Sequence, residues 1–436
     1  MKQKNLRSRI FWLIDSIKGN HLNKHLNEIN TVLTNPENKT SRNIRENNLN
    51  NILQHAVNTT PYYSKYINAK SVFDFPVVKK NLIQDNFEEF RSKPFIDKKN
   101  FKVSTSGSTG VPFFLFQDKT KRDRNKADVL YFLNRCDYNI GDRLFNLAVR
   151  LKQSKTKRLM SWLQNVALIE IGKLNNEKII EILDQVKKDR NKNKVMLGYA
   201  SGFESVIDFL DNNSYDLKDI NLNSIIVNSE YLSRQTKKTL SKYFNTQALS
   251  RYSSEEVGIV AHQTLDSVDS FVLNHASYFI EVLNFENDDH VKKGEIGRIV
   301  ITDLFNYAMP LIRYDTGDIA KYNINEKGIT EFERIEGRKL DLIYNTQGNV
   351  LSSYIVYKKF YNYYHLLKQY QFIQQGEKEY EIVLNLRNDT FGFEKELIQD
   401  VKNDFGQDAK VLIKYVNEIP PLSSGKRRKV VNNYKT

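Results

Sequence analysis

The spacing of hydrophobic positions changes several times along the chain, and each change predicts a different kind of element. Residues 1–95 have a mostly helical pattern, interrupted by the breakers TTPYY at 59–63 and FPVV at 75–78. The segment FKVST precedes a loop rich in glycine, serine and threonine, and VPFFLF follows this loop. The arrangement predicts two strands on either side of a turn. Residues 119–136 return to a helical pattern.

Short apolar segments alternate with amphipathic ones in the next part of the chain. KVMLGYAS (194–201) and NSIIVNSEYLS (223–233) each precede a helical pattern, and ALSRYSSEEVG follows at 248–258. This alternation predicts an α/β core with parallel strands, whose ligands gather beyond the carboxyl ends of the strands. The polar stretches GYAS, NSE and YSSEE stand at those strand ends, so we expect them to line a site.

The pattern becomes all-β from about residue 270 to 336 and then changes again. After residue 338, strand, helix and strand patterns such as YEIVLNL and AKVLIKYV follow one another. A chain of 436 residues exceeds the roughly 250–300 residues at which one core stops growing. We therefore expect mixed sheets in two domains: a large N-terminal domain over 1–337, with α/β subdomains and a small β subdomain, and a small α+β domain over 338–436.

Composition narrows the class of protein. Hydrophobic residues make up 40% of the chain, too many for a disordered protein. The single cysteine, Cys136, excludes an intrachain disulfide and a zinc site built on several thiolates, and we expect it to be a buried apolar residue. No apolar run reaches the roughly 18 residues of a membrane span, and a cytoplasmic location is expected. A helix around Phe11, Trp12 and Ile14 could pack on the main body or rest on a membrane surface.

The formal net charge of +14 raises the alternative of a module that binds nucleic acid or another polyanion. The densest basic clusters, at 186–194 and 425–431, lack the interleaved aromatic residues that stack on bases. We therefore expect no specific nucleic-acid site. The charge suits a general attraction for anionic substrates.

The loop in STSGSTGVPFF, residues 104–114, is a candidate phosphate site. Its glycines let several backbone N–H groups converge, and its hydroxyl groups add donors for phosphate oxygens. The spacing differs from the Walker loop, and Val111 stands where a lysine would be expected. Taken alone, the string could equally be a turn without special purpose.

Further motifs follow in a fixed order: RYSSEEVG (251–258), MPLIRYDTGD (309–318), EGRKLDLI (336–343) and PPLSSGKRRKV (420–430). The series resembles the adenylate-forming enzymes, which include acyl-CoA synthetases, amino-acid adenylation domains and luciferases. With TTPYYSKY and FPVVKKNLI, it looks most like the phenylacetate-CoA ligase group and its CapK-like branch. The resemblance runs from about residue 55 to the C-terminus. It implies an enzyme that uses ATP and Mg²⁺ to activate a small carboxylic acid as an acyl adenylate.

The resemblance also implies roles for individual residues. The loop would hold the β and γ phosphates, Tyr252 would lie against the adenine, and Asp318 and Arg338 would reach the ribose region. Glu256 would bind Mg²⁺, although Ser253 and Glu255 depart from the family pattern and could shift this role by one position. The loop and the strand ends complete the expected nucleotide site, with Thr105, Ser106, Gly107, Ser108, Thr109, Gly110, Asn228, Ser229, Glu230, Ser253 and Ser254.

Lys426 matches the lysine that a mobile C-terminal domain carries to the carboxylate and the α-phosphate. The family hinge falls on Leu340 here instead of an acidic residue or a lysine, with Asp341 next to it, which could move the pivot by one residue. The acyl pocket would take in Tyr199, Ser201 and His262 besides the polar strand ends, which favours a small or polar acid. His262 could also be an ordinary packed histidine.

The resemblance leaves the acceptor open between coenzyme A, giving a thioester, and an amine, giving an amide. The CapK-like branch suggests surface-polysaccharide biosynthesis. A catalytically inactive nucleotide-binding scaffold of the same fold is the alternative that the departures at Ser253, Glu255 and Leu340 favour. Retention of Glu256, Asp318, Arg338 and Lys426 favours the enzyme.

Overall fold

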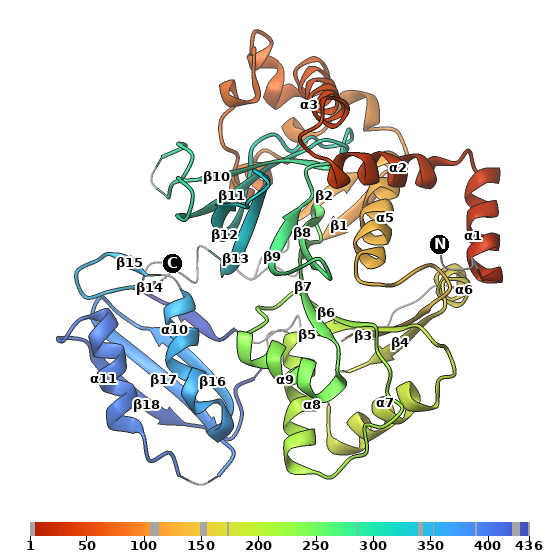
Figure 1. Cartoon of the computed structure of the whole chain (residues 1–436). Coiled ribbons are helices and arrows are strands. Elements are labelled where there is room, and N and C mark those ends of the chain that lie inside the picture. The colour runs from red at the N-terminus through yellow and green to blue at the C-terminus, as the bar shows by residue number, and fades with distance from the viewer. Residues whose placement is uncertain are drawn as a thin grey trace.

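The computed structural model describes residues 5–104, 113–148, 155–171, 174–285, 287–338, 343–351, 353–388, 390–420 and 428–434. A mixed sheet of eleven described strands runs through most of the chain (Figure 1), in the order β10-β11-β12-β13-β9-β8-β7-β6-β5-β3-β4. A separate four-stranded sheet is formed by the C-terminal residues. The predicted fold class, α/β with mixed sheets, is confirmed.

One half of the large sheet is parallel, as the alternation of apolar segments predicts. Its strands are β3 (Arg143–Ala148), β4 (Val166–Glu170), β5 (Lys194–Tyr199), β6 (Ser224–Asn228) and β7 (Gln247–Ser254). Helices α7 (Asn176–Lys188), α8 (Ala200–Asn212) and α9 (Arg234–Phe244) pack on this half. The strands are buried on both faces: Met196 packs with these helices, whereas Val195 and Leu197 pack with Leu133 and Cys136 on the opposite face.

The other half of the sheet is antiparallel and includes the region predicted to be all-β. Its strands are β8 (Gly258–Thr264), β9 (Ser267–Leu273), β10 (Tyr278–Leu283), β11 (Ile296–Asp303), β12 (Tyr314–Ile324) and β13 (Thr330–Arg338). Strand β7 belongs to both halves, because it pairs in parallel with β6 and antiparallel with β8. The residues of β7 therefore lie where the two kinds of pairing meet.

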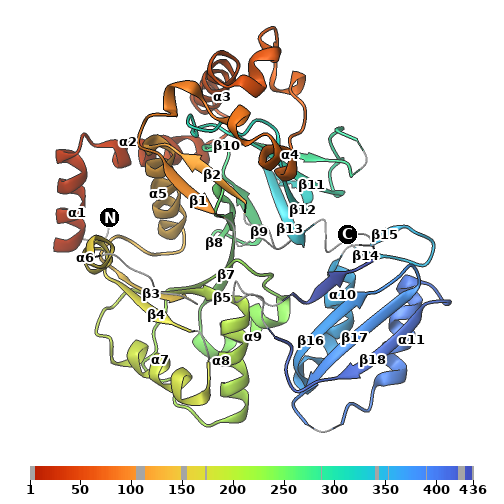
Figure 2. The same ribbon diagram turned by 180° about the vertical axis from the view of Figure 1, so that it is seen from behind.

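The N-terminal region is helical, as predicted, and covers the antiparallel half (Figure 2). Its elements are α1 (Leu6–Ile17), α2 (His21–Thr34), α3 (Lys39–Thr59), η1 (Pro61–Tyr66), η2 (Val72–Asp74), α4 (Lys80–Asp85), η3 (Phe87–Phe90) and η4 (Lys93–Phe95). Helix α1 packs on the main body through Phe11, while Leu6, Leu13 and Ile17 on its other side are exposed. No helix within the described ranges is both long and apolar enough to cross a membrane.

The two predicted strands at the glycine and serine loop are present. β1 (Phe101–Ser104) pairs antiparallel with β2 (Phe114–Gln117), and residues 105–112 between them lie outside the described residues. Helix α5 (Lys119–Asn134) follows at once, capped by the Asp118 side chain. A buried ion pair of 2.6 Å between Lys121 Nζ and Asp303 Oδ2 fixes this helix against β11. Helix α6 (Lys155–Leu163) lies beside α1 in both views (Figures 1 and 2).

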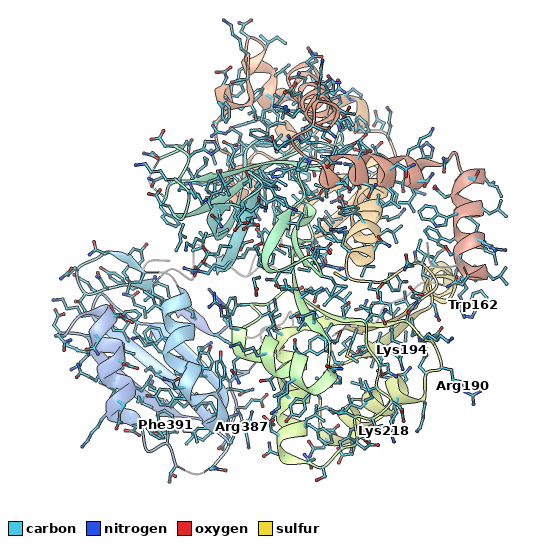
Figure 3. All side chains as sticks on the ribbon, in the orientation of Figure 1. Trp162, Arg190, Lys194, Lys218, Arg387 and Phe391 are labelled. Atoms are coloured by element: carbon cyan, nitrogen blue, oxygen red, sulfur yellow. The ribbon has the colours of Figure 1, made fainter. Side chains whose placement is uncertain are left out.

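The C-terminal residues form the sheet β18-β17-β16-β19, which has a hydrophobic core of its own. The elements are β14 (Ile343–Tyr344), β15 (Val350–Leu351), α10 (Ser353–Phe360), η6 (Tyr361–Leu366), β16 (Leu367–Gln374), β17 (Glu379–Leu386), α11 (Glu394–Phe405), β18 (Lys410–Tyr415) and β19 (Val430–Asn432). Figure 3 labels Arg387 on the side of this unit that faces α8, where it forms an ion pair with Asp208. The domain boundary near 338–341 stays a prediction, since residues 339–342 lie outside the described ranges.

Candidate active site

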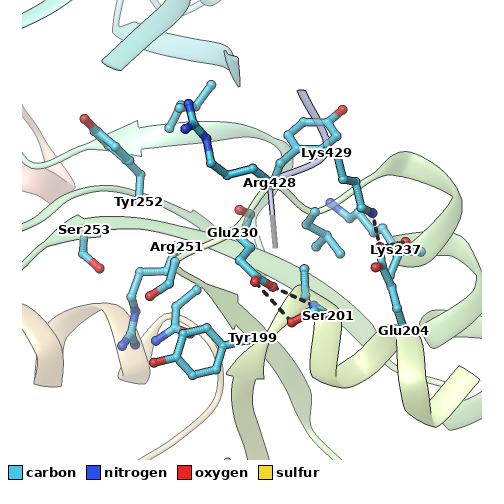
Figure 4. Close-up of a pocket in the computed structure, with 18 of the residues that line it drawn as sticks. Tyr199, Ser201, Glu204, Glu230, Lys237, Arg251, Tyr252, Ser253, Arg428 and Lys429 are labelled. Atoms are coloured by element: carbon cyan, nitrogen blue, oxygen red, sulfur yellow. Dashed lines mark hydrogen bonds and ion pairs between the residues drawn. The ribbon is translucent and has the colours of Figure 1, made fainter. Parts of the chain in front are cut away.

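A cleft of about 2710 Å³ lies where the carboxyl ends of β5, β6 and β7 meet the C-terminal unit. Parallel strands end at one edge of a sheet, so polar residues that are far apart in sequence come together there. The cleft is lined by the predicted residues Tyr199, Ser201, Asn228, Ser229, Glu230, Tyr252, Ser253, Ser254, Glu256 and Asp318. Figure 4 shows several of these side chains.

Glu230 and Ser201 join the ends of two neighbouring strands. The Glu230 carboxylate accepts hydrogen bonds from the Ser201 backbone N–H at 2.7 Å and from the Ser201 hydroxyl at 3.1 Å. Ser201 lies in the first turn of α8, so the carboxylate also satisfies a backbone donor at the positive end of that helix. Asn228 Oδ1 lies buried beside this pair without a hydrogen-bond partner among the described residues. It is a vacant acceptor at the edge of the cleft.

Tyr252 and Asp318 come from two different motifs and are in direct contact. The Tyr252 hydroxyl donates a hydrogen bond of 2.7 Å to Asp318 Oδ2 and lies 3.3 Å from Thr316 Oγ1. Burial, followed by the nearby Asp318 charge, raises the pKa of Tyr252 well above its ordinary value, so the phenol stays protonated. Asp318 is also the cross-strand partner of Arg338, because β12 and β13 pair at these positions. Strand pairing thus places Asp318 opposite Arg338, and a side-chain hydrogen bond links Tyr252 to Asp318.

Glu256 is the more buried of the two candidate magnesium ligands. Its side chain lines the cleft and is 9% exposed, whereas the neighbouring Glu255 is exposed. Glu256 Oε1 accepts a long hydrogen bond of 3.4 Å from the Tyr314 hydroxyl and forms no ion pair with the described residues. One buried carboxylate that lines the cleft fits Mg²⁺, which is commonly held by one or two carboxylates together with substrate phosphates. No group of three or more potential metal-ligating side chains occurs within the described part of the chain.

His262 does not line the cleft, which corrects the prediction that it belongs to the acyl pocket. Its side chain is fully buried and stacks on Phe132 of α5, with ring centroids 5.3 Å apart. Burial, together with the charge of Arg251, lowers its pKa well below the ordinary value, so the ring is neutral. Its neighbour Gln263 reaches the cleft instead. Side chains alternate between the two faces of a strand, and sequence position alone did not give the face.

The C-terminal unit contributes cations that the sequence analysis did not single out. Lys429 Nζ forms an ion pair of 2.5 Å with Glu204 of α8, and both side chains line the cleft together with Arg428. Burial tends to lower the pKa of Lys429, but the Glu204 charge outweighs it and raises the pKa above its ordinary value. The basic run GKRRKV was the available signal, but the partner on α8 was not predictable from it.

Several predicted residues fall on parts of the chain outside the described residues. These are Thr105, Ser106, Gly107, Ser108, Thr109, Gly110, Leu340, Asp341 and Lys426. For Arg338, only the position of the backbone in β13 is described. The roles expected for all of them stay predictions.

Comparison with known proteins identifies the fold. Residues 343–433 match the CapK C-terminal domain, and none of the curated proteins matches the sequence. Among solved structures, 2-hydroxyisobutyryl-CoA ligase in the postadenylation state, with a bound hydroxyisobutyryl adenylate, is similar with a TM-score of 0.71 and 15% identity, covering 89% of this chain and 88% of that chain. The same ligase in the thioesterification state gives a lower TM-score of 0.59, with 16% identity and coverage of 92% and 91%.

A second solved structure of the same fold is the amide bond synthetase McbA from Marinactinospora thermotolerans. Its TM-score is 0.53 at 13% identity, covering 73% of this chain and 65% of that chain. These likenesses agree with the motif order along the sequence. The chain has the fold of the adenylate-forming ligases, and its residues 343–433 match the CapK C-terminal domain.

Proposed function

We propose that the protein is an ATP-dependent ligase that activates a carboxylic acid as an acyl adenylate, with release of pyrophosphate. One observation carries the proposal: Tyr252 and Asp318, from motifs more than sixty positions apart, meet in one cleft and share a hydrogen bond. Asp318 is also paired across strands with Arg338. An acid and ATP are both anionic, so their reaction needs oriented donors and cations at the point of contact. The cleft supplies both kinds of group.

The nucleotide would be held on the side of the cleft that Tyr252 faces. A fixed carboxylate suits two ribose hydroxyl donors, and the Tyr252 hydrogen bond holds the Asp318 carboxylate in place. The loop at 105–110 would bind the phosphates, and Glu256 would hold Mg²⁺. When bound, Mg²⁺ would neutralise part of the phosphate charge. Glu256 would contribute its own carboxylate, which is largely buried and accepts a hydrogen bond from Tyr314.

Lys426 would bridge the carboxylate and the α-phosphate. Support comes from its neighbours, since Arg428 and Lys429 line the cleft, and Lys429 is tied to Glu204 on the large sheet's side. The higher similarity to the postadenylation state than to the thioesterification state agrees with a C-terminal unit placed for the first half-reaction. A compact ammonium on a flexible stem suits this bridging task.

The acceptor in the second half-reaction would be coenzyme A or an amine. The similar structures include an enzyme of each kind by name, a CoA ligase and an amide bond synthetase. The CapK C-terminal domain supports the narrower hypothesis of a step in surface-polysaccharide biosynthesis. We also propose that the enzyme is of the phenylacetate-CoA ligase-like subtype.

The test is carboxylate-dependent exchange of labelled pyrophosphate into ATP, with a panel of small aromatic, amino and sugar acids. We expect exchange with at least one acid and none without acid. Productive acids are then supplied with coenzyme A or with amines, and thioester and amide are measured side by side. ATP binding without exchange across the panel would replace the ligase with the inactive scaffold of the same fold.

A further inference from the structure

Arg251 is a buried cation that nothing in the described structure neutralises. Its side chain is 9% exposed and lines the cleft, and its Nε and Nη2 atoms are buried without a hydrogen-bond partner. No ion pair of Arg251 occurs among the described residues. A buried charge that lacks a partner is strongly destabilising, so proteins keep one where a ligand completes it.

The groups around Arg251 are neutral. Burial raises the pKa of the Cys136 thiol to about 12, and burial lowers the pKa of the His262 ring well below its usual range. These two are the titratable groups that interact with the guanidinium. Burial lowers the pKa of Arg251 itself to about 10, which still leaves it charged at neutral pH. The guanidinium of Arg251 therefore presents a positive charge on its side of the cleft.

Arg251 points away from the proposed nucleotide side. It precedes Tyr252 directly in β7, and successive side chains of a strand point to opposite faces. Tyr252 turns toward Asp318, whereas Arg251 is paired across strands with His262, which packs on α5. Figure 4 shows the two side chains leaving the strand in opposite directions. The ribose side of a bound nucleotide would therefore not supply the anion that pairs with Arg251.

A hydroxyl lies on the same side of the cleft as the guanidinium. Tyr199 ends β5, and its hydroxyl turns toward Arg251 in Figure 4. This hydroxyl forms no hydrogen bond with the described residues. Burial, followed by the charges of Glu230 and Glu255, raises the pKa of Tyr199, which keeps it a donor. The guanidinium and the phenol together offer several hydrogen-bond donors. That set suits a carboxylate or a phosphate.

We propose that Arg251, with Tyr199, binds a second anionic group on the acid, so that the substrates are acids that carry a carboxylate or phosphate besides the carboxylate to be activated. The inference deepens the proposed function and rests on it. The reacting carboxylate would be oriented toward the nucleotide, and the second anion would lie against Arg251. The general positive charge of the chain would favour the approach of such substrates.

The test compares acids matched in size, one with a second carboxylate or phosphate and one with a neutral amide in its place. For the wild type, kcat/KM in pyrophosphate exchange should be higher for the doubly anionic acid by roughly 10- to 100-fold, as expected for hydrogen bonds to a charged group. Arg251→Met should remove this preference. Lys238→Met takes one charge from an exposed lysine that also lines the cleft, and it should keep the preference. Comparing acids that carry a second carboxylate with acids that carry a phosphate shows which anionic group is preferred.

Thermal unfolding gives a second readout that needs no turnover. Without ligand, Arg251→Met should melt at or above the wild-type temperature, because it removes an uncompensated buried charge. The doubly anionic acid should raise the melting temperature of the wild type and leave that of Arg251→Met unchanged. A lower melting temperature of unliganded Arg251→Met would show that the arginine is structural and would overturn the inference.

The remaining outcomes separate this inference from the ligase proposal. If the acids that carry a neutral amide support exchange and a second anionic group does not raise kcat/KM, the role of Arg251 is refuted. The ligase proposal is then unaffected. An equal loss for both acids in Arg251→Met would assign the arginine to the reacting carboxylate, which also overturns the inference. Stabilisation by the doubly anionic acid without any exchange would leave an anion site at Arg251 and refute the ligase.

Discussion

The ion pair between Lys429 and Glu204 should control how often the C-terminal unit lies in the arrangement seen here. The two side chains are 18% and 28% exposed, and the atoms are 2.5 Å apart, so the pair is partly screened by water. Exposed pairs contribute about 0.2–1 kcal/mol, and hydrogen bonds to charged groups about 1.5–3 kcal/mol. An intermediate coupling of about 1–2 kcal/mol changes the population of the arrangement by roughly 5- to 30-fold.

The measurement is a double-mutant cycle of Glu204→Gln, Lys429→Met and the double variant. If the arrangement serves the first half-reaction, each single variant should slow pyrophosphate exchange by a similar factor, and the double variant should be hardly slower than either. Transfer from preformed adenylate should not slow. Lys414→Met is the matched control, because it breaks an ion pair of 2.8 Å with Glu381 inside the C-terminal sheet. Simply additive effects in the cycle would refute the reasoning.

Three further predictions concern single side chains. Lys426→Ala should abolish adenylate formation and leave ATP binding, measured by calorimetry, nearly unchanged; normal adenylation would show that the lysine is misassigned. Glu256→Gln should reduce magnesium-dependent turnover more than Glu255→Gln, since Glu256 is the buried carboxylate at the cleft, and the opposite order would move the ligand to Glu255. Burial, followed by the Arg124 charge, lowers the pKa of His25 from 6.5 to about 4, so the unfolded chain binds the extra proton and stability should fall as the pH decreases from about 6.5 to 4. Melting temperatures across this range should fall less steeply for His25→Gln, and an unchanged slope would contradict the assignment.

The parallel core was predictable because its signal is local. The apolar segments that end at Tyr199 and Asn228, each followed by an amphipathic stretch, are long and regular enough to identify strands and helices. The polar residues after them had to share one edge, because parallel strands end on the same side. The cleft-lining residues Tyr199, Ser201, Asn228, Ser229 and Glu230 followed from that rule. The motif order then indicated the superfamily.

His262 and Arg251 show where this reasoning ends. Arg251 begins the motif at 251–258 and His262 follows that motif, and the sequence pattern did not show which face of the sheet would meet helix α5. The charge of Arg251 gave no signal either, because a basic residue is ordinarily solvated. Only its burial without a counter-charge makes it a candidate binding residue.

The sequence by itself determined the kinds of elements, their order and the motif residues, because these depend on local periodicity and residue chemistry. Tertiary structure decided which distant groups touch: Asp318 with Tyr252, and Lys429 with Glu204. Such contacts depend on strand register and on the packing of separate units, which arise from many weak interactions spread over the chain. No short stretch of sequence carries that information, and so the partners of the charged groups became known only in the folded protein.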